Sequence, residues 1–136
     1  MKKAIPAVIV SGIILLLLSF AMLYSMVAVF PKQAEEYFSP VFRWSNAGTD
    51  WMFYVHPFIL SIALKWFWER YKDNFPGGTF LKALELAFVY GIVAMLPVLW
   101  LTFSAIDISP LMVLSWLGYG ILQAFVAGLV FAKLNP

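Results

Sequence analysis

The chain has 136 residues, of which 63% are hydrophobic and only 12% are charged. A soluble domain carries about 25% charged residues, so this chain has too few charges to cover a surface in water. Most of it must therefore be surrounded by lipid. The net charge of +2 comes from scattered basic residues, which argues against nucleic acid as a partner. No cysteine is present, which excludes thiolate catalysis, thiolate metal sites and disulfide exchange.

The first apolar run covers residues 4–30 and follows two lysines. A cleaved signal peptide starts in a similar way, but its apolar core has about 7–15 residues and ends at a small-residue cleavage site. This run is longer and has no convincing cleavage pattern, so we expect a retained transmembrane helix. Residues 31–50 form the longest polar connection and are rich in aromatic residues. A short helix at about 33–38 should lie there on the membrane surface.

Three more spans are expected at about 51–71, 80–103 and 110–133. Aromatic residues flank both ends of the second span, as at membrane interfaces, and Asp50 precedes it as a plausible cap. The third span contains Pro97, which should kink it.

The link between the third and fourth spans, residues 104–109, is very short, so these two spans should be antiparallel neighbours. Ser109 followed by Pro110 is typical of a helix start.

Lysine and arginine are distributed unevenly over the two sides of this arrangement. The side of the N-terminus holds seven basic residues: Lys2, Lys3, Lys65, Arg70, Lys72, Lys82 and Lys133. The opposite side holds two, Lys32 and Arg43. Basic residues favour the cytoplasmic side, so both chain ends should be cytoplasmic. We therefore predict a single all-α domain, a bundle of four transmembrane helices, in a cell membrane.

The stretches VHPFILSIALKWFWERYK in the second span and SWLGYGILQAFVAGLVFAKL in the fourth are the most distinctive parts of the chain. On these stretches the chain resembles the small, uncharacterised four-helix membrane proteins of bacteria. The resemblance implies a four-helix fold over the whole chain, and it implies no activity and no site residues. Small multidrug exporters have a similar size but carry a membrane-embedded glutamate in their first span, which residues 4–30 lack.

Lys65 and Glu85 are the charged residues placed deepest in the spans, at comparable depths. A charge inside a membrane usually faces the interior and finds a partner, so the two could form a buried ion pair with a role in ion or proton movement. Alternatively, Lys65 extends to the interface and Glu85 has a structural bond to Lys65 or Lys82.

The centre of each span is apolar or carries uncharged polar groups, namely Ser19, Ser61, Tyr90, Tyr119 and Gln123. Proton-coupled carriers normally need an ionisable residue at this depth, and none is found.

His56, Asp50 and Asp107 could form a polar site on the outer face, although an interfacial histidine and helix-capping acids are the simpler interpretation. The single histidine excludes a metal or haem site with two axial histidines in one chain, whereas a site shared between chains stays open. Interface belts and bundle packing explain most of the aromatic residues. We therefore expect neither a metal nor another cofactor.

Small residues recur every four positions on the last two spans, a spacing that lets helix backbones approach closely. They are Ala83, Ala87 and Gly91 on the third span and Gly120, Ala124 and Gly128 on the fourth, with Gln123 beside the latter. They indicate either a tight hairpin of these two spans or a contact with a second subunit.

Three functions remain compatible with these features. The first is a structural or accessory subunit, or a homo-oligomer, whose partners are the lipid bilayer and other membrane chains. The second is a channel or transporter for a small or lipophilic solute. The third is an intramembrane enzyme acting on a lipid, with His56 and Asp50, Glu35 or Asp107 at its site. Because the sequence shows no catalytic constellation, we favour the first and expect no enzyme.

Overall fold

The computed structural model describes residues 4–42 and 48–135. All regular secondary structure in these ranges is helical, as the sequence predicts. The elements are α1 (Ala4–Val29), α2 (Pro31–Glu35), the 3-10 helix η1 (Glu36–Phe38), α3 (Trp51–Tyr71), α4 (Thr79–Tyr90), the π-helical turn η3 (Gly91–Met95), α5 (Leu96–Ala105) and α6 (Pro110–Leu134). Within the described ranges, three helical stretches are long and apolar enough to cross a membrane: Ala4–Val29, Thr79–Ala105 and Pro110–Leu134.

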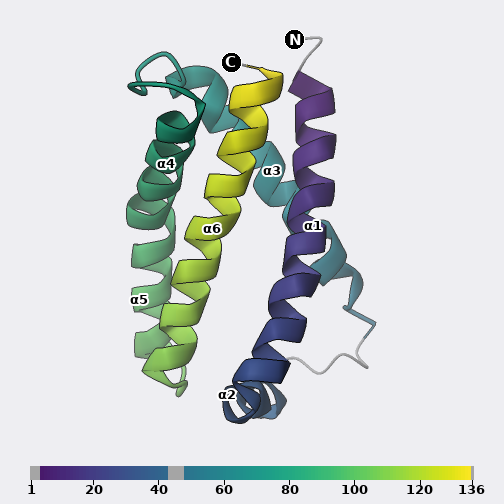
Figure 1. Cartoon of the computed structure of the whole chain (residues 1–136). Helices are drawn as coiled ribbons and strands as arrows, with labels where there is room; N and C mark the ends of the chain where they lie inside the picture. Colours follow the sequence, from purple (N-terminus) through teal and green to yellow (C-terminus); the bar gives the residue numbers. More distant parts are fainter. Residues whose placement is uncertain (1–3, 43–47, 136) are drawn as a thin grey trace.

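Helix α6 occupies the middle of the molecule (Figure 1). The column formed by α4, η3 and α5 packs along one side of α6, and α1 lies on its other side. The start of α1 and the end of α6 lie at the same end of the molecule, which we call the terminal end. Helix α2 and the turn between α5 and α6 lie at the opposite end, which we call the α2 end.

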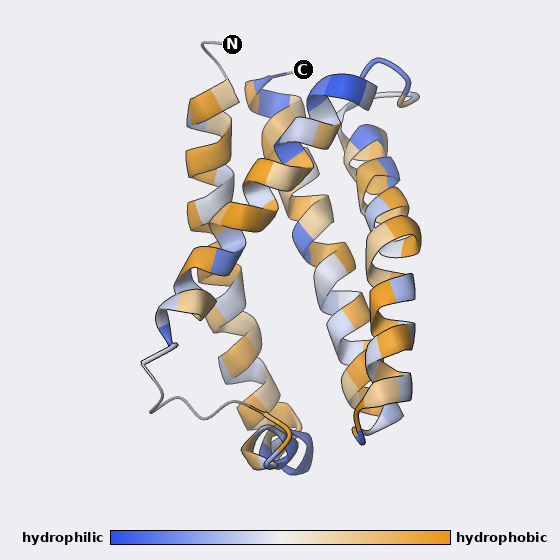
Figure 2. Cartoon of the chain, turned by 180° about the vertical axis from the view of Figure 1, so that it is seen from behind, coloured by the Kyte–Doolittle hydropathy of each residue, from blue (hydrophilic) through white to orange (hydrophobic). Residues whose placement is uncertain are grey.

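Apolar residues predominate along the helices, and polar residues are most frequent near the two ends of the molecule (Figure 2). Large apolar side chains point outward: Trp100 on α5 is 76% exposed and Tyr24 on α1 is 72% exposed. An exterior of this kind is unfavourable in water and favourable in a hydrocarbon environment. The structure is therefore that of a membrane-embedded protein.

Close backbone contacts join α4 to α6. A Cβ added to Gly128 would lie 2.8 Å from the Cα of Ala83, and one added to Gly91 would lie 2.9 Å from Cγ1 of Ile121. Small residues at these positions allow dispersion contacts to accumulate between the backbones. All six residues of the two predicted ridges are buried: Ala83, Ala87, Gly91, Gly120, Ala124 and Gly128. The hairpin of the third and fourth apolar segments is the arrangement seen.

The irregular turn η3 within the segment Thr79–Ala105 is explained by the proline that follows it. Pro97 has no backbone N–H, so the carbonyl of Val93 loses its usual helical partner. The chain widens into η3 directly before this proline. The irregularity expected at Pro97 thus takes the form of a π-helical turn.

The two expected caps differ. The Ser109 hydroxyl accepts a hydrogen bond from the Met112 N–H at 3.2 Å, as the sequence predicts. Asp50 precedes α3, but its side chain makes no capping hydrogen bond, so that prediction was wrong. Asp50 itself has a helical backbone conformation, with φ −59° and ψ −28°, instead of the extended conformation typical of a capping residue.

Helix α3 crosses α1 obliquely (Figures 1 and 2). In the middle of α3, the Ser61 hydroxyl donates to the Val8 carbonyl of α1 at 3.0 Å. At its start, the Phe53 ring packs against Phe20, near the middle of α1, with ring centroids 5.6 Å apart. Helix α3 therefore begins beside Phe20, and the part of α1 that follows Phe20 has no α3 alongside it.

Candidate functional site

A cavity of about 830 Å³ lies beside the part of α1 that α3 leaves uncovered. Its walls come from α1 between Ser19 and Phe30, from the first turns of α3 and from α6 between Leu111 and Tyr119. Gln33 of α2 and Tyr37 of η1 line it at the α2 end. Its volume lies within the range of about 300–1,000 Å³ that is usual for small-molecule sites.

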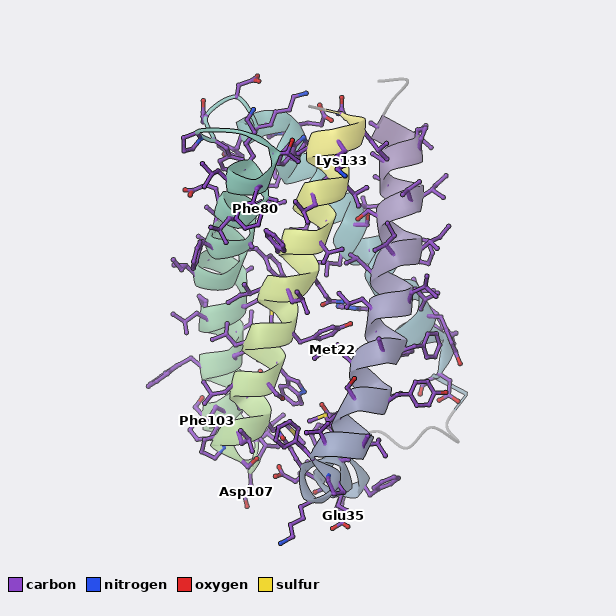
Figure 3. The ribbon with its side chains drawn as sticks, in the orientation of Figure 1. Met22, Glu35, Phe80, Phe103, Asp107 and Lys133 are labelled. Carbon is purple, nitrogen blue, oxygen red and sulfur yellow. The ribbon has the colours of Figure 1, made fainter. Side chains whose placement is uncertain are left out.

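The cavity wall is mainly apolar and adaptable. Met22, Met26 and Met52 contribute flexible thioether side chains, and Met22 lies between α1 and α6 (Figure 3). Methionine adjusts its shape to different partners because it has several rotatable bonds. Among the described residues that line the cavity, none is an Asp, Glu, Lys or Arg. The cavity therefore suits an uncharged molecule with a substantial apolar part.

A chain of hydrogen bonds forms the end of the cavity nearest the middle of the molecule. The hydroxyls of Ser19 and Tyr119 lie 2.6 Å apart and join α1 to α6. The Gln123 amide nitrogen, one helical turn from Tyr119, donates to the Tyr119 hydroxyl at 2.9 Å. The Ser19 hydroxyl donates to the Leu15 carbonyl at 2.9 Å. Ser19 and Tyr119 line the cavity, while Gln123 is buried behind them.

Further polar groups lie where the cavity reaches the α2 end. The Trp116 indole N–H donates to the Tyr37 hydroxyl at 2.6 Å, which ties α6 to η1. The Gln33 amide lies at the limit of hydrogen-bonding distance, 3.5 Å, from the Ser115 hydroxyl. Burial raises the pKa of Tyr37 above its ordinary value of 10.0; the bond from Trp116 lowers it and the nearby Glu36 carboxylate raises it further. Tyr37 is therefore neutral at physiological pH.

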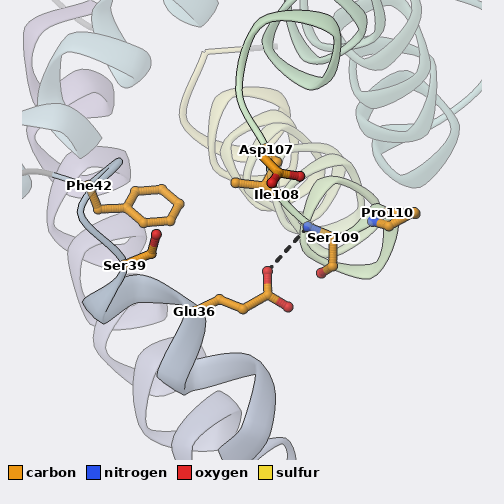
Figure 4. Close-up of a pocket in the computed structure, with 7 residues that line it drawn as sticks. All are labelled: Glu36, Ser39, Phe42, Asp107, Ile108, Ser109 and Pro110. Carbon is orange, nitrogen blue, oxygen red and sulfur yellow. Dashed lines mark hydrogen bonds between the residues drawn. The ribbon is translucent and has the colours of Figure 1, made fainter.

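The predicted outer-face group of His56, Asp50 and Asp107 is not assembled as one site. His56 lines the large cavity, whereas Asp107 lines a separate hollow of about 410 Å³ together with Glu36 (Figure 4). In that hollow the Glu36 carboxylate accepts a hydrogen bond from the Ser109 backbone N–H at 3.2 Å, at the start of α6. In the described ranges no hydrogen bond or ion pair joins His56 to either aspartate.

The predicted pairing of Lys65 with Glu85 was wrong. Lys65 is buried and forms an ion pair with Glu69, one turn further along the same helix, while Glu85 is exposed. The Lys65 ammonium also lies 5.3 Å from the centre of the Phe131 ring. A partner at i+4 is within reach at any helix orientation, whereas Glu85 had to face α3 from a neighbouring helix and instead points away.

Glu69 has a second bond, because the Asn135 side-chain amide donates to the same carboxylate. The Trp68 indole N–H donates to the Asn135 carbonyl at 3.0 Å. These two contacts hold the end of α6 against α3. The group around Lys65 is thus a structural junction at the terminal end.

The cavity itself was not predicted from the sequence. Ser19, Tyr119 and Gln123 stood out as polar residues in the middle of the spans, and Tyr119 and Gln123 share one face of a helix. That spacing signals one hydrogen bond. It carries no information on the angle between α1 and α6, which creates the space beside them.

No family model matches the chain, and neither the curated proteins nor the solved structures contain a significant match. The function must therefore be argued from the geometry of the site.

Proposed function

We propose that this protein is a multi-pass membrane protein that binds an uncharged lipophilic molecule in the cavity between α1, α3 and α6. The observation that carries the proposal is the cavity itself: about 830 Å³ in volume, mainly apolar, and closed at one end by hydroxyl groups. Apolar pockets with a few convergent polar groups are the usual form of small-molecule sites. Binding of this kind serves a carrier for a lipophilic solute, the second of the functions expected from the sequence.

In the proposed arrangement both termini are cytoplasmic and the α2 end faces outward, because basic residues gather at the terminal end. Helix α3 is the fourth segment in the membrane. It is tilted, and its first turn lies beside Phe20. Three apolar stretches supply the other crossings. The cavity then opens in the outer half of the membrane.

The depth of the cavity supports this placement. From Ser19 to Val29, both on its wall, α1 advances ten residues, or about 15 Å at roughly 1.5 Å per residue. That length is about half of a hydrocarbon core roughly 30 Å thick. A molecule of the outer leaflet could therefore enter at any point along the length of the cavity.

Two alternatives receive less support. Movement of ions would need charged groups in the interior, and Lys65 is neutralised by Glu69 at the terminal end, away from the cavity. Lipid-modifying chemistry would need a base and an acid together, and His56 and Asp107 line separate hollows.

A role as an accessory subunit or homo-oligomer remains the second candidate, favoured by one specific observation. Helix α5 presents a large apolar surface, with Val98 61%, Trp100 76% and Leu101 67% exposed. In a complex this surface would contact another membrane chain. Native mass spectrometry from a mild detergent would detect a second copy or a partner subunit, and a bare monomer would argue against this candidate.

Photo-crosslinking of the purified protein in nanodiscs tests the binding proposal. The probe is a dodecanol that carries a diazirine in the middle of its chain. Labelling of the cavity walls should saturate and should be reduced by unlabelled dodecan-1-ol, whereas labelling of the exposed α5 surface should not saturate. Met22→Trp and Met26→Trp place a bulky ring in the cavity and should reduce the saturable labelling about tenfold.

Leu101→Trp is the matched control, because it adds the same ring to an exposed position on α5. It should leave the saturable labelling unchanged. Labelling of the cavity walls that never saturates, or that is equal in all variants, would rule out a binding site there.

A further inference from the structure

The hydrogen-bond chain at the deep end of the cavity has a defined direction. A serine hydroxyl has one proton, and that of Ser19 is used for the Leu15 carbonyl. The short contact between Ser19 and Tyr119 must then use the proton of Tyr119. The Tyr119 hydroxyl has no second proton, so its bond to Gln123 must use an amide N–H, as found. The chain therefore runs from Gln123 to Tyr119 to Ser19 to Leu15.

This direction decides what the two hydroxyls can offer to a ligand. Every proton of Ser19 and Tyr119 is already engaged within the protein, and only acceptor lone pairs remain. Both hydroxyls line the cavity, and Gln123 with its N–H groups lies behind them. A ligand atom can therefore form a hydrogen bond with Ser19 or Tyr119 only if it brings its own proton.

On the basis of the proposed binding function, we propose that the cavity selects a long-chain amphiphile with a hydroxyl group that enters first and donates a hydrogen bond to Ser19 or Tyr119. An ether or ketone of the same shape finds no donor at Ser19 or Tyr119 and loses its bond to water on entry.

The position of the hydroxyl pair distinguishes this ligand from an ordinary membrane lipid. Ser19 lies about 15 Å along α1 from Val29 and thus near the middle of the membrane in the proposed orientation. A phospholipid of the outer leaflet would bring only the methyl end of a chain to this depth. A molecule that presents a hydroxyl group there gains a hydrogen bond that such a chain cannot form.

A pair of isomers tests the selection. Dodecan-1-ol and 1-methoxyundecane have the same atoms and nearly the same length, but only the alcohol has a proton to donate. Each is added as a competitor against the diazirine probe on the full-length protein in nanodiscs, after correction for its partition into the lipid. The alcohol should compete about five- to tenfold better, as one net hydrogen bond implies.

Two variants should change this preference by different routes. Ser19→Ala removes the acceptor of the Tyr119 proton, which then becomes available to an ether oxygen. Tyr119→Phe removes the acceptor of the Gln123 N–H and exposes that donor to the cavity. Both variants should lower the preference for the alcohol to equality or reverse it, and each checks the other if one of them does not fold.

Ser104→Ala is the matched control. Ser104 is exposed on α5, and its hydroxyl donates to the Leu101 carbonyl at 2.8 Å. Because Ser104 does not line the cavity, this variant should keep the full preference for the alcohol.

The outcomes separate the two proposals. If neither isomer competes for the cavity, the proposed binding function fails. If both compete equally well against the wild-type protein, or if Ser19→Ala keeps the full preference for the alcohol, the cavity binds lipophilic molecules but the selection for a hydroxyl donor is wrong.

Discussion

The two ends of the helix assembly are packed in opposite ways. At the terminal end, α3, α4 and α6 close around fully buried aromatic rings, with the Trp68 and Phe131 ring centroids 6.2 Å apart. At the α2 end, α1 and α6 separate around a cavity of about 830 Å³, and the rings of Tyr37 and Trp116 lie at its border. The terminal end is closely packed, and the α2 end encloses a cavity.

The difference follows from which residues lie between the helices. In lipid the hydrophobic effect does not favour one helix contact over another, so close packing must supply the stability. Small residues and large buried rings provide it at the terminal end. Methionines and hydrogen-bonded hydroxyls line the cavity instead. The hydrogen bond between Ser19 and Tyr119, at its end nearest the middle of the molecule, joins α1 to α6.

Removal of the buried ring at the terminal end should have the largest effect. Trp68→Ala leaves a hole beside Phe131 and Phe75 and deletes the hydrogen bond to Asn135. The free energy of unfolding should fall by about 3 kcal/mol, near the lower limit for a buried tryptophan because the unfolded helices remain in lipid. Reversible unfolding in mixed micelles of detergent and denaturing detergent measures it.

The control is Trp66→Ala, two residues away on the same helix. Trp66 is 57% exposed and contacts the Arg70 guanidinium on the surface. This change should cost less than about 1 kcal/mol. Equal losses of stability for the two tryptophans would mean that the terminal end is not the more closely packed end of the molecule.

Alanine substitutions at two glycines of α6 should have smaller effects on stability, and the two effects should have opposite signs. Gly128→Ala places a methyl group 2.8 Å from the Ala83 Cα and should destabilise the protein by about 1–2 kcal/mol. Gly118, on the same helix, has no atom within 4 Å of an added Cβ. Gly118→Ala should therefore be neutral or stabilise the protein by up to about 1 kcal/mol, since alanine favours a helix. The same unfolding assay compares them, and a stabilising Gly128→Ala would contradict the close contact.

The closely packed terminal end was easier to predict from the sequence than the α2 end. The repeat of small residues at Ala83, Ala87 and Gly91 indicates a close helix contact without any knowledge of the fold, because the spacing is local. The start and end of α3 follow in the same way from its flanking aromatic residues. The partner of Lys65 was wrong because two helices of known depth still have unknown rotation, and Glu85 faces outward.

The cavity lies beyond such reasoning for a related reason. Its existence depends on α3 beginning beside Phe20 and not beside α2, and on the separation of α1 from α6. Both are relations between distant parts of the chain. The separate residues Ser19, Tyr119 and Gln123 were visible in the sequence, but the direction of their hydrogen bonds follows only from the distances between them.

The smallest expected effect concerns Tyr37 at the open end. Tyr37→Phe removes the acceptor of the Trp116 indole N–H, which is accessible to solvent, so the stability at neutral pH should fall by less than about 1 kcal/mol.

The pKa of Tyr37 is raised by burial, so its neutral form stabilises the fold fully below the ordinary value of 10.0. That contribution disappears as the pH rises through the higher pKa of the folded protein. Above about pH 10 the wild-type protein should therefore lose stability faster than Tyr37→Phe, and parallel unfolding series at pH 8 and pH 11 measure the difference. Identical pH dependence in the two proteins would mean that Tyr37 is solvated, and that the open end of the molecule is wider than the border formed by Tyr37 and Trp116.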